Sequence, residues 1–167
     1  RKWHAPSKNM HPAIYHLKRL IQNLQKERDV AMYCDLHSHS RQKGCFMYGC
    51  LAEEKTKIKS YIDSSSSPSS KRMGKKKSLG RGDQLKLHDP RVFSYMLMQR
   101  CPTMFTYKKC DFRVQKAKEC TARVVVCKEL KVRNSYTMEI SFCGQVETPP
   151  HFSLTQLLSV GESFGLA

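Results

Sequence analysis

Two groups of residues have types and positions that suit acid–base or metal chemistry. The first is the polar run 35–40, DLHSHS, which follows a short apolar segment. The second is Glu139, a carboxylate between apolar residues in the segment 135–142. A buried carboxylate is costly unless a cation, a metal or hydrogen bonds compensate it. In a catalytic metal centre, the ion polarises a carbonyl while a nearby Glu accepts a proton from water.

Each of these residues also has a simpler interpretation. Glu139 suits the solvent face of a half-buried strand, which is where most carboxylates lie. The two histidines of the run suit ordinary hydrogen bonds at a strand end, and we expect only one of them to enter any given site. A third alternative is a closed structural zinc site. Its candidate ligands are Cys34, His37, His39, Cys45 and Cys50, whose spacing matches no standard zinc finger.

Helical and strand-like segments alternate along the chain and predict an α/β fold. Apolar residues at helical spacing predict a helix over 12–27, and another begins at 89–90. The apolar runs 30–36 and 46–51 predict strands, the first buried on both faces of a parallel sheet. Period-two alternation predicts a strand over 135–142, and a capping box at 153–156 predicts a last helix. The β-branched run 124–126 suits a strand that begins at a surface Arg123.

Composition and charge indicate one domain that attracts polyanions. The chain has 167 residues and a formal net charge of +16. Part of this charge lies in the segment 62–84, which we predict to be a disordered Ser/Lys-rich insertion. Its basic run 71–77 suits a nuclear-localisation or nucleic-acid patch, but we favour a solvated charge run. The eight cysteines form no C-x-x-C pair, and with no sign of secretion we expect reduced thiols in a cytosolic or nuclear protein. The even number of cysteines leaves a disulfide framework as the alternative.

Three long segments contain rare residue combinations. They are YCDLHSHSRQKGCFMYGC at 33–50, TARVVVCKELKVRNSYTMEISFCG at 121–144, and RKWHAPSKNMHPAIYHLKRLI at 1–21. The first resembles the block YCD-x-HGHSRKKNVFMYGC of the cytosolic carboxypeptidases, a branch of the zinc metallocarboxypeptidases. The second resembles that family's TARVVVWRE and RSYTMEASFCG blocks, and the third resembles the stretch after its L-N-R motif. The resemblance implies that 1–167 is the C-terminal portion of such a catalytic domain.

The resemblance implies a role for four residues of this chain. His37 falls on a zinc ligand, and Glu139 falls on the general base that activates water. Arg1 falls on the residue that helps bind the substrate's C-terminal carboxylate, which suits the bidentate geometry of guanidinium. Arg123 lies near the position of a basic residue in the specificity pocket, which would suit an acidic terminal side chain. Cys127 replaces a Trp that is usual in the family.

One part of the family's pattern is missing from the sequence. The other zinc ligands come from an H-x-x-E motif, and no H-x-x-E occurs in this chain. We therefore expect a carboxypeptidase-like mixed sheet with helices on both faces and without its N-terminal strands. Because catalytic zinc usually has three protein ligands, we also expect this chain alone to bind zinc poorly and to be inactive.

The resemblance implies a function for the full-length protein. It is the zinc-dependent removal of C-terminal residues, glutamate above all, from acidic protein tails such as those of tubulin. We expect a cytoplasmic protein, with the microtubule, the cilium and the nucleus as further places, and neither a membrane nor nucleic acid as its partner. The alternative is a catalytically inactive fragment or pseudoenzyme that acts as a basic polyanion-binding module.

Overall fold

The computed structural model describes residues 2–51, 89–144 and 151–167. The predicted role of Arg1 and the predicted insertion at 62–84 therefore lie outside the described residues. The elements in chain order are α1 (Pro12–Leu24), β1 (Met32–His39), β2 (Cys45–Tyr48), α2 (Arg91–Arg100), the 3₁₀ turns η2 (Tyr107–Lys109) and η3 (Lys116–Lys118), α3 (Ala122–Lys128), β3 (Asn134–Ser141) and α4 (Leu154–Leu166).

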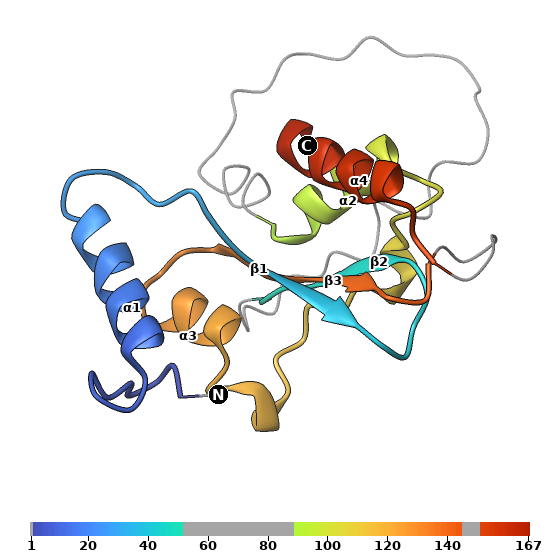
Figure 1. The fold of residues 1–167 in the computed structure, drawn as a ribbon. Coiled ribbons are helices and arrows are strands. Elements are labelled where there is room, and N and C mark those ends of the chain that lie inside the picture. The colour runs from blue at the N-terminus through green and yellow to red at the C-terminus, as the bar shows by residue number, and fades with distance from the viewer. Residues whose placement is uncertain (1, 52–88, 145–150) are drawn as a thin grey trace, which may run out of the picture.

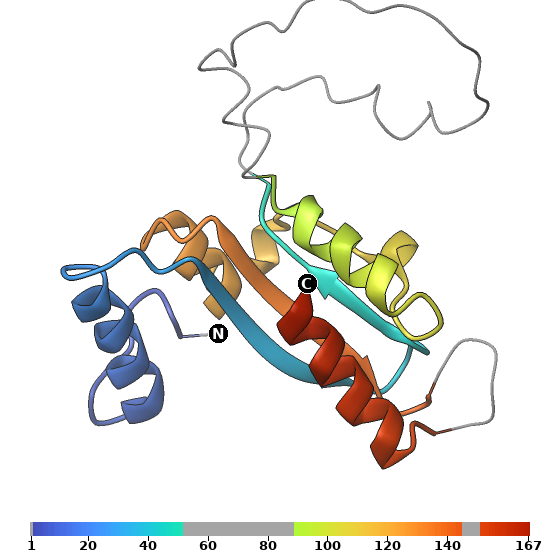
Figure 2. The same cartoon turned by 90° about the horizontal axis from the view of Figure 1, so that it is seen from above.

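The described strands form a mixed three-stranded sheet in the order β1-β3-β2. β3 lies in the centre, parallel to β1 and antiparallel to β2. Figure 1 shows α2 and α4 on one side of this sheet and α1 and α3 on the other. Figure 2 shows α4, in red, alongside the carboxyl-terminal half of β1, with α2, in green, on the side of β2. The expected mixed sheet with helices on both faces is confirmed.

The two faces of the sheet have different characters. The apolar face packs against α2 and α4, and its core includes Met47, Leu97, Tyr136, Met138 and Val160, all 2% exposed or less. The opposite face, here called the polar face, carries the odd-numbered residues of β1 and β3 and the even-numbered residues of β2. At one end of the polar face, α1 and α3 form a second core with Trp3, Ile21, Val125, Val126, Leu130 and Val132. The helices cover the strand starts of β1 and β3 and leave His37 exposed.

Local sequence signals account for most of the element boundaries. Pro12 stands in the first turn of α1, where its missing N–H costs no hydrogen bond. Ser153 caps α4, because its side chain accepts a hydrogen bond from the Gln156 amide while the Gln156 side chain accepts one from Ser153. The predictions of α1, β1, β2, α2, β3 and α4 are confirmed, with boundaries shifted by a few residues.

The run 124–126 is helical, so the prediction of a strand that begins at a surface Arg123 is wrong. These three valines lie inside α3 and are at most 2% exposed, and Arg123 is only 6% exposed. A short apolar run does not distinguish a buried strand from a buried helix, because burial on all sides removes the periodicity that separates them. Tertiary packing against α1 and the sheet has overridden the strand preference of valine here.

β1 departs from the prediction that it is buried on both faces. It is an edge strand among the described elements, and Leu36, His37 and Ser38 are exposed. The opposite edge of the sheet is covered, since the amide of Thr106 donates to the Cys45 carbonyl and that of Asp111 donates to the Met47 carbonyl. β1 therefore presents an open edge in the part of the chain that the structure describes.

We predict that Tyr136→Phe destabilises the fold by about 1 kcal/mol, the net contribution of one buried hydrogen bond. The Tyr136 ring is fully buried in the apolar core, and its hydroxyl donates to the Pro90 carbonyl over 2.9 Å at the start of α2. Urea unfolding followed by circular dichroism would measure the change. Tyr95→Phe is the matched control, because Tyr95 is 47% exposed and its substitution should leave stability unchanged. Equal effects of the two substitutions would contradict the role of this contact.

Candidate active site

His37 and Glu139 lie side by side on the polar face. They are Cα partners in the parallel pairing of β1 with β3, and residues directly opposite in adjacent strands point to the same side of a sheet. Glu139 is half-buried, whereas the His37 side chain is 53% exposed. Phe46 of β2 is the partner of Glu139 on its other side and is fully buried. The carboxylate is thus flanked by an apolar ring and an accessible imidazole.

Asp35 orients the imidazole of His37. Its Oδ2 lies 3.1 Å from His37 Nε2 on the same face of β1. A carboxylate this close to one ring nitrogen favours the tautomer with the proton on that nitrogen and leaves the other nitrogen as a lone-pair donor. This arrangement makes His37 a suitable ligand for a metal ion through Nδ1.

His39 also projects from the polar face, so the expectation that only one histidine could face a given site is wrong. Residues two apart in a strand share a face, and His39 pairs with Ser141 one step beyond His37 and Glu139. Its ring has a structural role instead. His39 Nδ1 accepts hydrogen bonds from the amides of Arg41 and Gln42, both at 3.1 Å, and the ring contacts Phe46 edge-on.

Arg123 is a buried cation at the other end of the polar face. Its side chain comes from α3, and the Ser135 hydroxyl donates to its backbone carbonyl over 2.8 Å, which joins the helix to β3. The Nε atom is buried and has no hydrogen-bond partner among the described residues. The guanidinium carbon lies 5.4 Å from the ring centroid of Tyr48, a cation–π arrangement. A buried guanidinium with an unsatisfied donor suits the binding of a carboxylate.

Tyr48 connects Arg123 with the carboxylate of the site. It pairs with Thr137, one pleat from Glu139, and its pKa is raised by burial first and then by the charge of Glu139. The positive charge of Arg123 opposes this rise in the pKa. Tyr48 therefore stays protonated at neutral pH, and the charges of both Glu139 and Arg123 act on its hydroxyl.

The donors present do not complete a zinc site. The described residues contain no group of three His, Cys, Asp or Glu side chains that could hold a metal ion. His37 with Asp35 supplies one suitable ligand, whereas catalytic zinc usually has three from the protein. The closed structural site is contradicted, because Cys34 and Cys45 project from the apolar face, opposite to His37. None of the eight cysteines forms a disulfide bond in the structure.

Two residues of the site escaped the sequence analysis. Asp35 was noted as part of the polar run, but its spacing of two from His37 was a usable sign that both lie on one face of a strand. Tyr48 had no such sign, because its position beside Arg123 depends on the packing of α3 against β2. Arg1 lies outside the described residues, and the other predicted residues, His37, Glu139 and Arg123, are all on the polar side of the sheet.

The fold is that of the metallo-carboxypeptidases. A metallo-carboxypeptidase from Burkholderia cenocepacia superposes on 98% of this chain with a TM-score of 0.66 and 14% sequence identity. The match covers 35% of that chain. No protein-family model matches the sequence. In the described residues, no helix has both the length and the apolarity to cross a membrane.

The sequence is homologous to the cytosolic carboxypeptidases over nearly its whole length. It is 34% identical to cytosolic carboxypeptidase 3 of Mus musculus over 98% of the chain. It is 41% identical to cytosolic carboxypeptidase 1 of Xenopus laevis over 86%, and 34% identical to cytosolic carboxypeptidase 2 of Xenopus tropicalis over 98%. The chain spans between one tenth and one seventh of the lengths of these curated relatives, 10% to 14%.

The stacking of Arg123 on Tyr48 can be tested by a double-mutant cycle. We expect Tyr48→Leu and Arg123→Met to show a coupling of about 1 kcal/mol in urea unfolding, because each substitution removes the same cation–π contact. Tyr95→Leu combined with Arg123→Met is the control and should be additive, since Tyr95 is an exposed residue of α2. Additive effects in both cycles would show that the Tyr48–Arg123 contact contributes nothing to stability.

Proposed function

We propose that this chain carries part of the active site of a zinc-dependent carboxypeptidase. The full-length protein would remove C-terminal residues, glutamate above all, from acidic protein tails such as those of tubulin. The observation that carries the proposal is the alignment of His37 with Glu139 across β1 and β3, with Asp35 holding the imidazole. The homology to proteins named cytosolic carboxypeptidases supports the reaction and a cytoplasmic location.

Each residue of the proposed site has a separate task. His37 would supply one ligand to the metal, whose further ligands are not among the described residues. Glu139 accepts a proton from the attacking water, which suits a half-buried carboxylate that no described cation neutralises by an ion pair. Arg123 receives the side-chain carboxylate of the terminal residue, and Arg1 is proposed to help bind the main-chain carboxylate. The net charge of +16 would raise the local concentration of acidic tails.

The role of Glu139 predicts the loss of activity in Glu139→Gln. In the full-length protein, this change should lower the release of glutamate from a polyglutamate-tailed peptide at least a hundredfold, because general-base catalysis contributes about 10²–10⁴. Amino-acid analysis of the released residues would measure it. Glu162→Gln, at an exposed position of α4, is the matched control and should retain full activity. Normal turnover by Glu139→Gln would refute the proposed mechanism.

The role of Arg123 predicts a change in substrate preference. Arg123→Lys keeps the charge but loses the two parallel hydrogen bonds to a carboxylate, so KM for a terminal glutamate should rise about tenfold. For a peptide that ends in glutamine, which lacks this carboxylate, KM should change little. Arg113→Lys is the control, since the Arg113 side chain is 85% exposed and pairs with Asp111. Equal changes in KM for both peptides would contradict the assignment.

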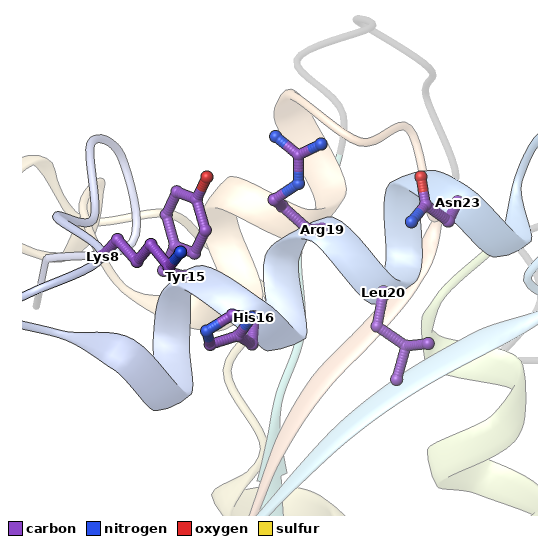
Figure 3. Close-up of a pocket in the computed structure, with 6 residues that line it drawn as sticks. All are labelled: Lys8, Tyr15, His16, Arg19, Leu20 and Asn23. Atoms are coloured by element: carbon purple, nitrogen blue, oxygen red, sulfur yellow. The ribbon is translucent and has the colours of Figure 1, made fainter.

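A second candidate function is a basic module that binds polyanions without hydrolysing them. It is favoured by a surface pocket on α1 lined by Lys8, Tyr15, His16, Arg19, Leu20 and Asn23 (Figure 3). The Arg19 guanidinium lies 5.8 Å from the Tyr15 ring centroid, and Lys8 borders the same hollow. The zinc content of the purified full-length protein separates the two functions. One zinc ion per chain with peptide hydrolysis supports the enzyme, whereas salt-sensitive binding of polyglutamate without zinc supports the module.

A further inference from the structure

Two cysteines that are far apart in the sequence lie close together at α3. Cys50 follows the end of β2 by two residues and is 4% exposed, whereas Cys127 in the last turn of α3 is partly exposed. The Cys50 Sγ lies 3.7 Å from the backbone carbonyl oxygen of Arg123. Arg123 and Cys127 are four residues apart in α3, so they share one side of the helix, and the Cys127 thiol is close enough to Cys50 for each to shift the pKa of the other.

The surroundings make the two thiols chemically different. The pKa of Cys127 is lowered to about 7, first by the neighbouring Cys50 thiol and then by the charges of Lys128, Lys131 and Arg123, against the effect of burial. The neighbouring Cys127 thiol and burial raise the pKa of Cys50. Tyr136 of β3 lies near both thiols and stays neutral, because burial raises its pKa. Cys127 is therefore the nucleophile of the pair, and Cys50 is a buried thiol within reach of it.

Cys127 differs from the other cysteines whose pKa is shifted. Burial raises the pKa of Cys34 and Cys45 to about 12 and that of Cys110 to about 11. Such thiols are almost fully protonated at neutral pH and react slowly.

We propose that Cys50 and Cys127 form a peroxide-reactive dithiol site that closes to a disulfide between the end of β2 and α3. The Cys127 thiolate attacks one oxygen of hydrogen peroxide, the O–O bond breaks, and a sulfenic acid and hydroxide form. The hydroxide takes up a proton to become water. The Cys50 sulfur then attacks the sulfenic sulfur, the S–O bond breaks, and the Cys50 proton leaves with the hydroxyl as a second water. Two thiols and one peroxide thus give one disulfide and two waters.

The product would fix α3 to β2 one helical turn from Arg123. The carbonyl of Arg123 already accepts a hydrogen bond from Ser135 of β3 and lies beside Cys50. A covalent bond at Cys127 would therefore link the helix that carries the buried guanidinium to two strands at once. The oxidation chemistry itself does not depend on carboxypeptidase activity.

The test is peptide mapping of the full-length protein after treatment with an equimolar amount of hydrogen peroxide at pH 7.5. Mass spectrometry should find one major cross-link, Cys50 to Cys127, which dithiothreitol reverses. Cys120→Ser is the matched control, since Cys120 is the exposed thiol, and this variant should form the same cross-link. Protein unfolded in urea before oxidation should lose the selectivity. A folded protein in which Cys127 is oxidised without the cross-link, or in which other pairs form equally, would overturn the proposal.

Two substitutions of Cys50 separate its roles as hydrogen-bond donor and as disulfide partner. Cys50→Ser keeps a donor, so the reaction of Cys127 with iodoacetamide should still titrate with a midpoint near 7, while the cross-link disappears. Cys50→Ala removes the donor as well and should slow this reaction at pH 7 about tenfold, as the pKa returns toward that of an ordinary thiol. Circular dichroism would confirm folding. Equal reactivity of Cys127 in the folded Cys50→Ala variant and the wild type would contradict the assigned pairing.

Discussion

The register between β1 and β3 is the constraint on which the site depends. Side chains alternate between the two faces of a strand, so a slip of one residue would move His37 to the apolar face and leave Glu139 beside a different neighbour. The register is fixed by burial rather than by the polar residues themselves. Tyr136 and Met138 fill the core under α2 and α4, and a slip of β1 by one residue against β3 would turn Asp35 and His37 toward that core.

The second fixed element is α3, which brings a cation to a face that already carries carboxylates. Its valines are buried with α1, and the Ser135 hydroxyl binds the Arg123 carbonyl, so the helix is positioned by an apolar core and one polar contact. The ring of Tyr48, in β2, then packs against the Arg123 guanidinium. Arg123 is buried, and its Nε atom has no hydrogen-bond partner among the described residues, which is costly for a cation.

Local sequence patterns predicted an element correctly where a short-range signal alone determines it. The capping box at Ser153, Pro12 in the first turn of α1 and the alternation in 135–142 each describe a local arrangement, and each was confirmed. The run 124–126 was predicted as a strand because complete burial hides helical periodicity, and burial is a property of the whole fold. Likewise, the resemblance selected His37 and Glu139, whereas Asp35 and Tyr48 became visible as site residues only when strand faces and tertiary contacts were known. The contact between Cys50 and Cys127 joins positions 77 residues apart, which no local pattern reveals.

The alignment of His37 with Glu139 can be measured directly by cross-linking. In the full-length protein, His37→Cys combined with Glu139→Cys places two thiols on adjacent strands, which are about 4.8 Å apart in a β-sheet. A short methanethiosulfonate cross-linker should join these two positions, as identified by peptide mapping. The comparison variant combines His37→Cys with Ile140→Cys, whose side chain projects from the apolar face. The register described above predicts the bridge in the first variant and not in the second, and the reverse result would contradict the account of the active site.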